Sequence, residues 1–72
     1  MGEAMTYYIF YFIGETGGII GAASVACATL EDAEAEAAAR LGGHLAVEVW
    51  RDGRQMAFVR HGAAQQVEDR AA

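Results

Sequence analysis

The feature that most constrains this chain is an Asp-Gly pair that stands between two apolar runs. Asp52 and Gly53 separate Leu45–Trp50 from Gln55–Val59. Asp-Gly is typical of a two-residue type I′ turn, whose twist matches the twist of the strands that flank it. The sequence therefore predicts a β-hairpin over residues 45–59.

A two-residue loop also predicts the register of this hairpin. Val49 is expected opposite Met56, and Val47 opposite Phe58. Since side chains alternate between the two faces of a strand, these four residues and Leu45 are expected to share one face.

The N-terminal part of the chain predicts a second hairpin. Thr6–Ile13 is rich in Tyr, Phe and Ile, which favour a strand. Gly14–Gly18 has the length and the glycine content of a hairpin turn. Ile19–Ala28 is expected to be the second strand, and its glycines allow a bulge or a tight bend.

A helix is predicted between the two hairpins, over Leu30–Leu41. Thr29 is the expected N-cap, and Asp32 follows it at the position of a capping-box acid. Gly42 is expected to stop the helix. The apolar stripe consists mainly of alanine, so the helix is expected to approach a sheet closely.

These elements predict an α+β fold in the order ββαββ, with a four-stranded antiparallel sheet and one helix packed on one face. A single domain is expected over 1–72, with 1–5 and 62–72 flexible. The face expected under the helix holds Tyr8, Phe10, Phe12, Val47, Val49, Met56 and Phe58. The other face is expected to hold Tyr7, Ile9, Tyr11, Ile13, Trp50 and Val59.

The second face is large, apolar and aromatic, and one helix covers only one side of a sheet. Exposed apolar patches of this kind mark interaction surfaces, and Tyr and Trp are common in binding hot spots. The alternative is that the strands curl and the C-terminal tail folds back over this face.

Composition excludes several functions. The chain has 72 residues, five Arg, no Lys and ten acidic residues, for a net charge of −5. Without Lys there is neither a P-loop lysine nor Schiff-base chemistry, and a single Cys excludes an internal disulfide. An acidic chain is not expected to bind nucleic acid directly. Neither apolar stretch reaches the about 20 residues that span a bilayer, so a cytoplasmic protein that does not bind a membrane is expected.

Candidate catalytic and metal-binding residues are few. His44 and His61 would lie opposite each other if the hairpin register extended that far, but no third ligand is predicted nearby. Exposed histidines at the end of the hairpin are therefore favoured over a metal-sensing or ligand-binding site. Cys27 lies in an apolar strand without a basic neighbour in sequence. No catalytic residue, metal ligand or cofactor is assigned, and the chain is not expected to be an enzyme.

The predicted helix carries a cluster of acids, which suits a partner protein with a basic surface. Early acids also stabilise a helix through its dipole, and this is the alternative explanation. The residues expected to bind a partner are the acids Glu31, Asp32, Glu34 and Glu36, and the aromatic anchors Tyr7, Tyr11 and Trp50.

Two stretches carry a resemblance to known proteins. Y-I-F-Y-F-I-G-E-T-G-G at 8–18 and G-H-L-A-V-E-V-W at 43–50 resemble small uncharacterised proteins of alphaproteobacteria and their phages. The resemblance covers 6–60. In size, acidity and lack of an active site the chain also resembles the small acidic anti-CRISPR proteins of phages and prophages.

The anti-CRISPR resemblance implies a stoichiometric inhibitor that binds a CRISPR effector complex and blocks its DNA-binding surface. No functional residue is carried over, because no motif defines that group. The alternative is a homodimeric regulatory or structural module of bacteria, in which the aromatic face closes on its twin.

Overall fold

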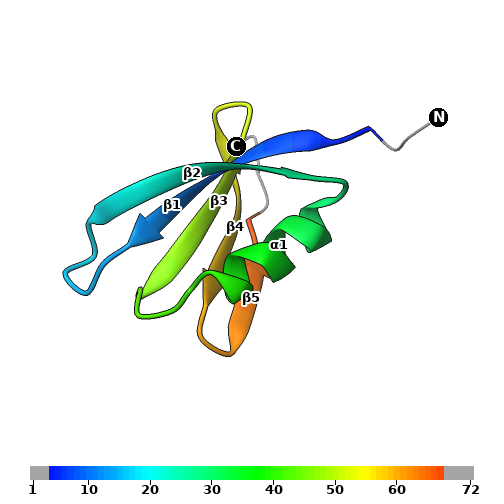
Figure 1. The fold of residues 1–72 in the computed structure, drawn as a ribbon. Helices are drawn as coiled ribbons and strands as arrows, with labels where there is room; N and C mark the ends of the chain where they lie inside the picture. Colours follow the sequence, from blue (N-terminus) through cyan, green and yellow to red (C-terminus); the bar gives the residue numbers. More distant parts are fainter. Residues whose placement is uncertain (1–3, 68–72) are drawn as a thin grey trace.

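A computed structural model describes residues 4–67 of the chain as one sheet and one helix (Figure 1). In chain order the elements are β1 (Thr6–Ile13), β2 (Ile19–Cys27), α1 (Leu30–Ala39), β3 (Ala46–Arg51), β4 (Arg54–Arg60) and β5 (Ala63–Gln66). The strands pair antiparallel in the order β2-β1-β3-β4-β5, and α1 lies on one side of the sheet. The predicted α+β class and the single helix are confirmed.

The ends of α1 follow from local chemistry. Thr29 is extended and its Oγ1 accepts a hydrogen bond of 3.0 Å from the backbone N–H of Asp32, so the predicted cap is confirmed. The helix ends at Ala39, and Gly42 has a φ of +50°, a conformation that glycine adopts without strain. Leu41 lies beyond the helix but remains buried in the core. Within residues 4–67, no helix has the length and the apolar run that crossing a membrane requires.

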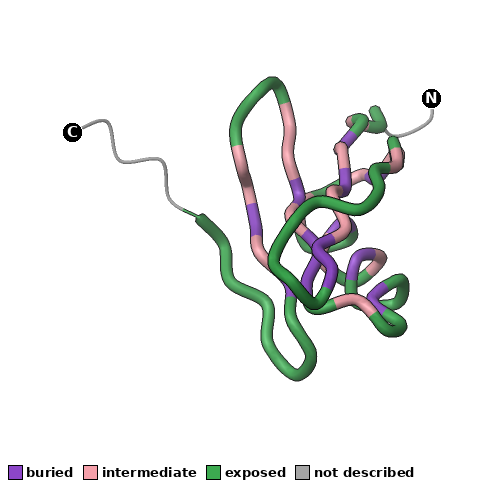
Figure 2. The backbone as a smooth tube through the Cα atoms, turned by 90° about the vertical axis from the view of Figure 1, so that its left-hand side faces the viewer, coloured by how far each residue is buried: buried purple, intermediate pink, exposed green. Residues whose placement is uncertain are grey.

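The core lies between α1 and the middle strands of the sheet. Tyr8 and Phe10 of β1 pack there with Val47 and Val49 of β3. The helix contributes mainly small side chains, of which the fully buried ones are Ala33 and Ala37. Figure 2 shows the buried positions gathered where the middle strands face α1, and exposed positions along β5 and the turns. Alanine thus lets the helix backbone lie close to bulky strand residues.

The C-terminal part of the chain differs from the prediction. Residues 62–72 are expected to be flexible, but Ala63–Gln66 forms a fifth strand that pairs with β4. Gly62, with a φ of +79°, makes the tight turn between the two strands. The segment has no β-branched or aromatic residue to signal a strand, and backbone pairing to the β4 edge forms it. Residues 1–3 and 68–72 lie outside the described part of the chain.

The register of the β3–β4 hairpin also differs from the prediction. The turn is as expected, with φ of 53° at Asp52 and 78° at Gly53. The register then shifts by one residue, so Val49 pairs with Ala57 and not with Met56. Met56 is the extra residue of a β-bulge. Relative to the predicted register, this extra residue moves every later side chain of β4 to the opposite face of the sheet.

This shift corrects the assignment of two residues of β4. Val59, predicted for the uncovered face, is buried in the core opposite Val47. Phe58, predicted for the core, lies opposite Glu48 on the other face and is half-buried. Ile13 is buried as well, although it is predicted to form part of the exposed face.

The close approach of α1 predicts that enlarging a buried alanine destabilises the fold. Ala37 is 0% exposed, so Ala37→Leu is expected to lower the free energy of unfolding by about 1–3 kcal/mol through overpacking. Ala39→Leu, on the exposed side of the same helix, is the control and is expected to change it by less than about 0.5 kcal/mol. Urea denaturation measures both, and equal effects would contradict the packing described above.

Candidate functional site

The sheet face opposite α1 carries the residues with the clearest binding chemistry. Alternation along β1 turns Tyr8 and Phe10 into the core, so Tyr7 and Tyr11 lie on the other face. We call this face the open face and define it by Tyr7, Ile9, Tyr11, Glu48, Trp50 and Phe58, which the strand register places together. Tyr7 is 70% exposed, so it is available to a partner.

Three residues at the centre of the open face hold one another in place. The ring centroids of Tyr11 and Trp50 are 5.8 Å apart with an interplanar angle of 90°, an edge-to-face contact. The indole Nε1–H of Trp50 donates a hydrogen bond of 2.9 Å to Oε1 of Glu48. Because each group is oriented by a neighbour, binding there costs little side-chain ordering.

The open face also has the chemistry to attract a guanidinium group. The Glu48 carboxylate has acceptor capacity beyond the one hydrogen bond from Trp50. Aromatic rings attract a cation over their faces, and Arg is the most frequent such cation. Arg60 of the chain itself places its Cζ 5.9 Å from the ring centroid of Phe58. A ring and a carboxylate side by side thus have the chemistry to contact a guanidinium group.

The four acids of α1 do not form one uniform charged patch. Glu31 and Asp32 are exposed. Glu36 instead accepts a hydrogen bond of 2.7 Å at its Oε2 from Nε of Arg40, which offsets its charge. Oε2 of Glu34 is buried and has no hydrogen-bond partner within residues 4–67. The exposed acids of the helix are therefore those of its first turn.

The structure separates the two sets of residues expected to bind a partner. The acids are on α1, and the aromatic residues are on the sheet face that points away from α1. Tyr11 and Trp50 are in contact, and Tyr7 lies on the same face further along β1. One flat partner surface cannot cover both sets at once, so they are separate candidate surfaces.

The two histidines approach each other, but not as the predicted register implies. The bulge shifts the register, and Ala46 pairs with Arg60. Nε2 of His61 then lies 3.2 Å from the backbone carbonyl oxygen of His44, whose ring packs against Phe12 with centroids 5.1 Å apart. Among the described residues, no three His, Cys, Asp or Glu side chains gather as a metal site would require.

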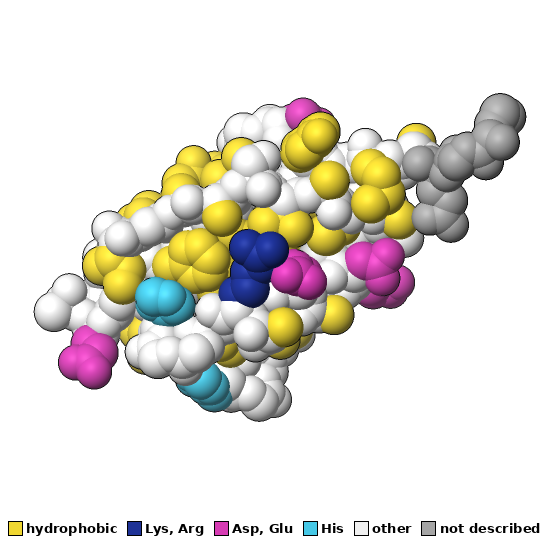
Figure 3. All heavy atoms as spheres, in the orientation of Figure 1, with side chains coloured by type: hydrophobic (Ala, Val, Ile, Leu, Met, Phe, Trp, Pro, Cys, Tyr) yellow, Lys and Arg dark blue, Asp and Glu magenta, His cyan; other side chains and the backbone are white. Residues whose placement is uncertain are grey.

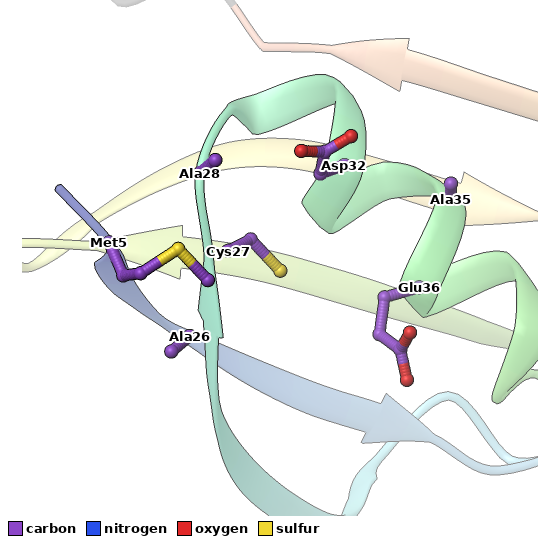
Figure 4. Close-up of a pocket in the computed structure, with 7 residues that line it drawn as sticks. All are labelled: Met5, Ala26, Cys27, Ala28, Asp32, Ala35 and Glu36. Carbon is purple, nitrogen blue, oxygen red and sulfur yellow. The ribbon is translucent and has the colours of Figure 1, made fainter. Parts of the chain in front are cut away.

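A hollow between β2 and α1 was not anticipated from the sequence. It has a volume of about 480 Å³ and is open to solvent on one side. Its lining residues come from the end of β2, the segment before β1 and the helix, and Figure 4 shows Cys27 pointing from β2 toward α1; the residues are Met5, Ala26, Cys27, Ala28, Asp32, Ala35 and Glu36. The only sequence signal for it is the run of small residues at the end of the second strand.

The surroundings of the Cys27 thiol in this hollow disfavour its thiolate form. Burial raises its pKa, the carboxylates of Glu36 and Asp32 raise the pKa further, and Arg40 lowers it. Because the thiolate is the reactive form, a raised pKa keeps the sulfur protonated and unreactive near neutral pH. The arrangement therefore does not support thiol catalysis.

Comparison with protein-family models, with curated proteins and with solved structures finds no match to this chain. The chemistry of the open face and of α1 is therefore the basis for a functional proposal.

The electrostatics around Cys27 predict how its alkylation rate depends on pH. At pH 8 the thiol is expected to react with iodoacetamide more slowly than in the urea-unfolded chain, because less of it is thiolate. Glu36→Gln removes a nearby negative charge, lowers the pKa and moves the pH–rate profile of the folded chain to lower pH. Glu31→Gln, at an exposed position, is the control. Identical profiles for the two variants would contradict this account of the thiol.

Proposed function

We propose that the chain is a non-enzymatic binding protein that recognises a basic surface of a partner protein through its open face. The observation that carries the proposal is the arrangement of Tyr11, Trp50 and Glu48, in which two rings and a carboxylate are held in fixed positions. Such a group fits an arginine side chain, which combines a planar cation with several N–H donors.

Charge supports a basic partner. The net charge of −5 attracts a positively charged surface at long range and increases the rate of association. Glu31 and Asp32 contribute to this attraction from the opposite side of the molecule without touching the same partner surface. We assign these acids to steering and the open face to contact.

No catalytic residue, metal or cofactor enters the proposal. The raised pKa of Cys27 disfavours a nucleophilic role. Stoichiometric binding is the simplest activity that these groups support.

For the partner we propose the DNA-binding surface of a CRISPR effector complex, in the cytoplasm of a bacterial host cell. The support is the resemblance in size and acidity to anti-CRISPR proteins, together with the suitability of the open face for arginine. A surface that reads DNA is rich in Arg and Lys, so an acidic protein competes there with phosphates. The second candidate is a homodimeric regulatory or structural module, in which two copies close their open faces on each other.

Substitutions on the two sides of the molecule distinguish the candidate surfaces. Tyr7→Ala and Glu48→Gln are each expected to weaken capture of an immobilised CRISPR effector about tenfold, since they remove an anchor ring and the carboxylate charge. The matched control is Glu31→Ala combined with Asp32→Ala, which is expected to change the Kd less than about threefold at 0.15 M salt, since charges away from the contact are screened.

Three results would contradict parts of the proposal. Loss of capture only in the α1 variant would assign binding to the helix acids. Absence of capture by the unmodified chain would remove the CRISPR partner. A dimer that Tyr7→Ala dissociates, found together with absence of capture, would favour the homodimeric module.

A further inference from the structure

Glu48 lies on the open face with an aromatic residue on three of its sides. In the strand register it pairs with Tyr11 of β1 and with Phe58 of β4, and directly opposed side chains lie on one face with Cβ atoms about 5 Å apart. Trp50, two residues further along β3, lies on this face as well. A half-buried carboxylate is therefore bordered by three aromatic rings.

The Glu48 carboxylate is held by one hydrogen bond and has room for more. The indole Nε1–H of Trp50 donates to its Oε1 at 2.9 Å. Among the residues that the structure describes, Glu48 makes no ion pair. A carboxylate has about four acceptor positions, so about three remain for a ligand with N–H groups. A half-buried negative charge of this kind is stabilised by a cation from a partner.

The rings around Glu48 indicate which cation suits the place. The guanidinium of Arg60 already lies 5.9 Å from the ring centroid of Phe58. Tyr11 and Trp50 meet at an interplanar angle of 90°, and the carboxylate lies beside the indole. A planar guanidinium stacks on a ring and donates two parallel N–H bonds to a carboxylate, whereas an ammonium is a compact, strongly hydrated charge.

The acids on the other side of the sheet lack these neighbours. Figure 3 shows the side that carries α1, where acidic side chains lie apart from one another and one lies against a basic side chain. That pair on the helix is Glu36 with Arg40. The helix itself contains no aromatic residue, so its acids supply charge without rings.

We propose that the Glu48 site, formed by Glu48, Tyr11, Trp50 and Phe58, selects an arginine side chain of the partner over a lysine side chain, and that Trp50 sets this preference. The inference rests on the proposed function and deepens it, since it says which basic side chain is selected and why. By holding Oε1, the Trp50 N–H fixes the plane of the carboxylate. The remaining acceptor positions then meet two N–H groups of a guanidinium together, so Trp50 is a positioning residue that also supplies a ring.

Calorimetric titration with two peptides of equal length and charge tests the preference. One Gly-Ser peptide carries three arginines and the other carries three lysines. The unmodified chain is expected to bind the arginine peptide at least about tenfold more tightly. Trp50→Phe keeps a ring but removes the N–H donor, so it is expected to reduce the preference to less than about threefold, mainly by weakening the arginine peptide.

Two further variants serve as comparison and control. Glu48→Gln is expected to reduce the preference as Trp50→Phe does, and the double variant is expected to reduce it no further, because both changes act on one hydrogen-bonded unit. Glu15→Gln is the matched control for charge, since Glu15 is exposed in the turn between β1 and β2, away from the Glu48 site. It is expected to weaken both peptides alike and to keep the preference.

A measurement without ligand tests the positioning by itself. Trp50 is the one tryptophan of the chain, so its indole N–H gives a single NMR signal. A charged acceptor makes a stronger hydrogen bond than a neutral amide. Glu48→Gln is therefore expected to move this signal to higher field, and Glu15→Gln is expected to leave it in place.

The outcomes separate this inference from the proposed function. Equal binding of the two peptides by the unmodified chain would overturn the inference and leave the proposed function standing. A preference that Trp50→Phe leaves intact, or an indole signal that Glu48→Gln does not move, would overturn the role of Trp50. Failure of both peptides to bind would contradict the proposed function, and the inference with it.

Discussion

The structure depends on the packing of one helix, through small buried side chains, against one face of a sheet. Both faces of that sheet carry apolar residues. Ala33 and Ala37 let α1 lie close to Tyr8, Phe10 and the valines of β3, which supplies the core of a domain this small. Because α1 is the one helix of residues 4–67, the opposite face of the sheet has no helix over it. The open face follows from this single covering layer, and the exposed acids of α1 lie on the other side of the sheet.

The two surfaces differ in physical character. The open face presents rings and a carboxylate that are already oriented, which suits recognition of a charged side chain. The surface of α1 presents the exposed carboxylates of Glu31 and Asp32, which suit attraction of positive charge at long range. Because the two surfaces lie on opposite sides of the sheet, one flat partner surface does not cover both.

Local signals in the sequence predict most of the fold. The Asp-Gly turn, the aromatic β1 and the Thr29 cap are each determined by neighbouring residues, and each is confirmed. The sequence does not predict the bulge at Met56, because one added residue leaves the apolar pattern of β4 almost unchanged, with Phe58 and Val59 adjacent. The sequence does not predict β5 either, because its backbone pairing, and not its composition, makes it a strand. Alternation along the strands predicts that Tyr7, Tyr11 and Trp50 share a face, whereas the pairing of Glu36 with Arg40 and the hollow at Cys27 depend on three-dimensional placement.

The most direct test of the open face as a recognition surface is an NMR titration of the chain with an arginine-rich peptide. Shifts are expected at the Trp50 indole N–H and at the amides of 7–11 and 48–50, because the cation is expected to bind between the rings and Glu48. Shifts confined to the amides of 30–36, with the indole signal unchanged, would contradict this assignment and place recognition on the helix.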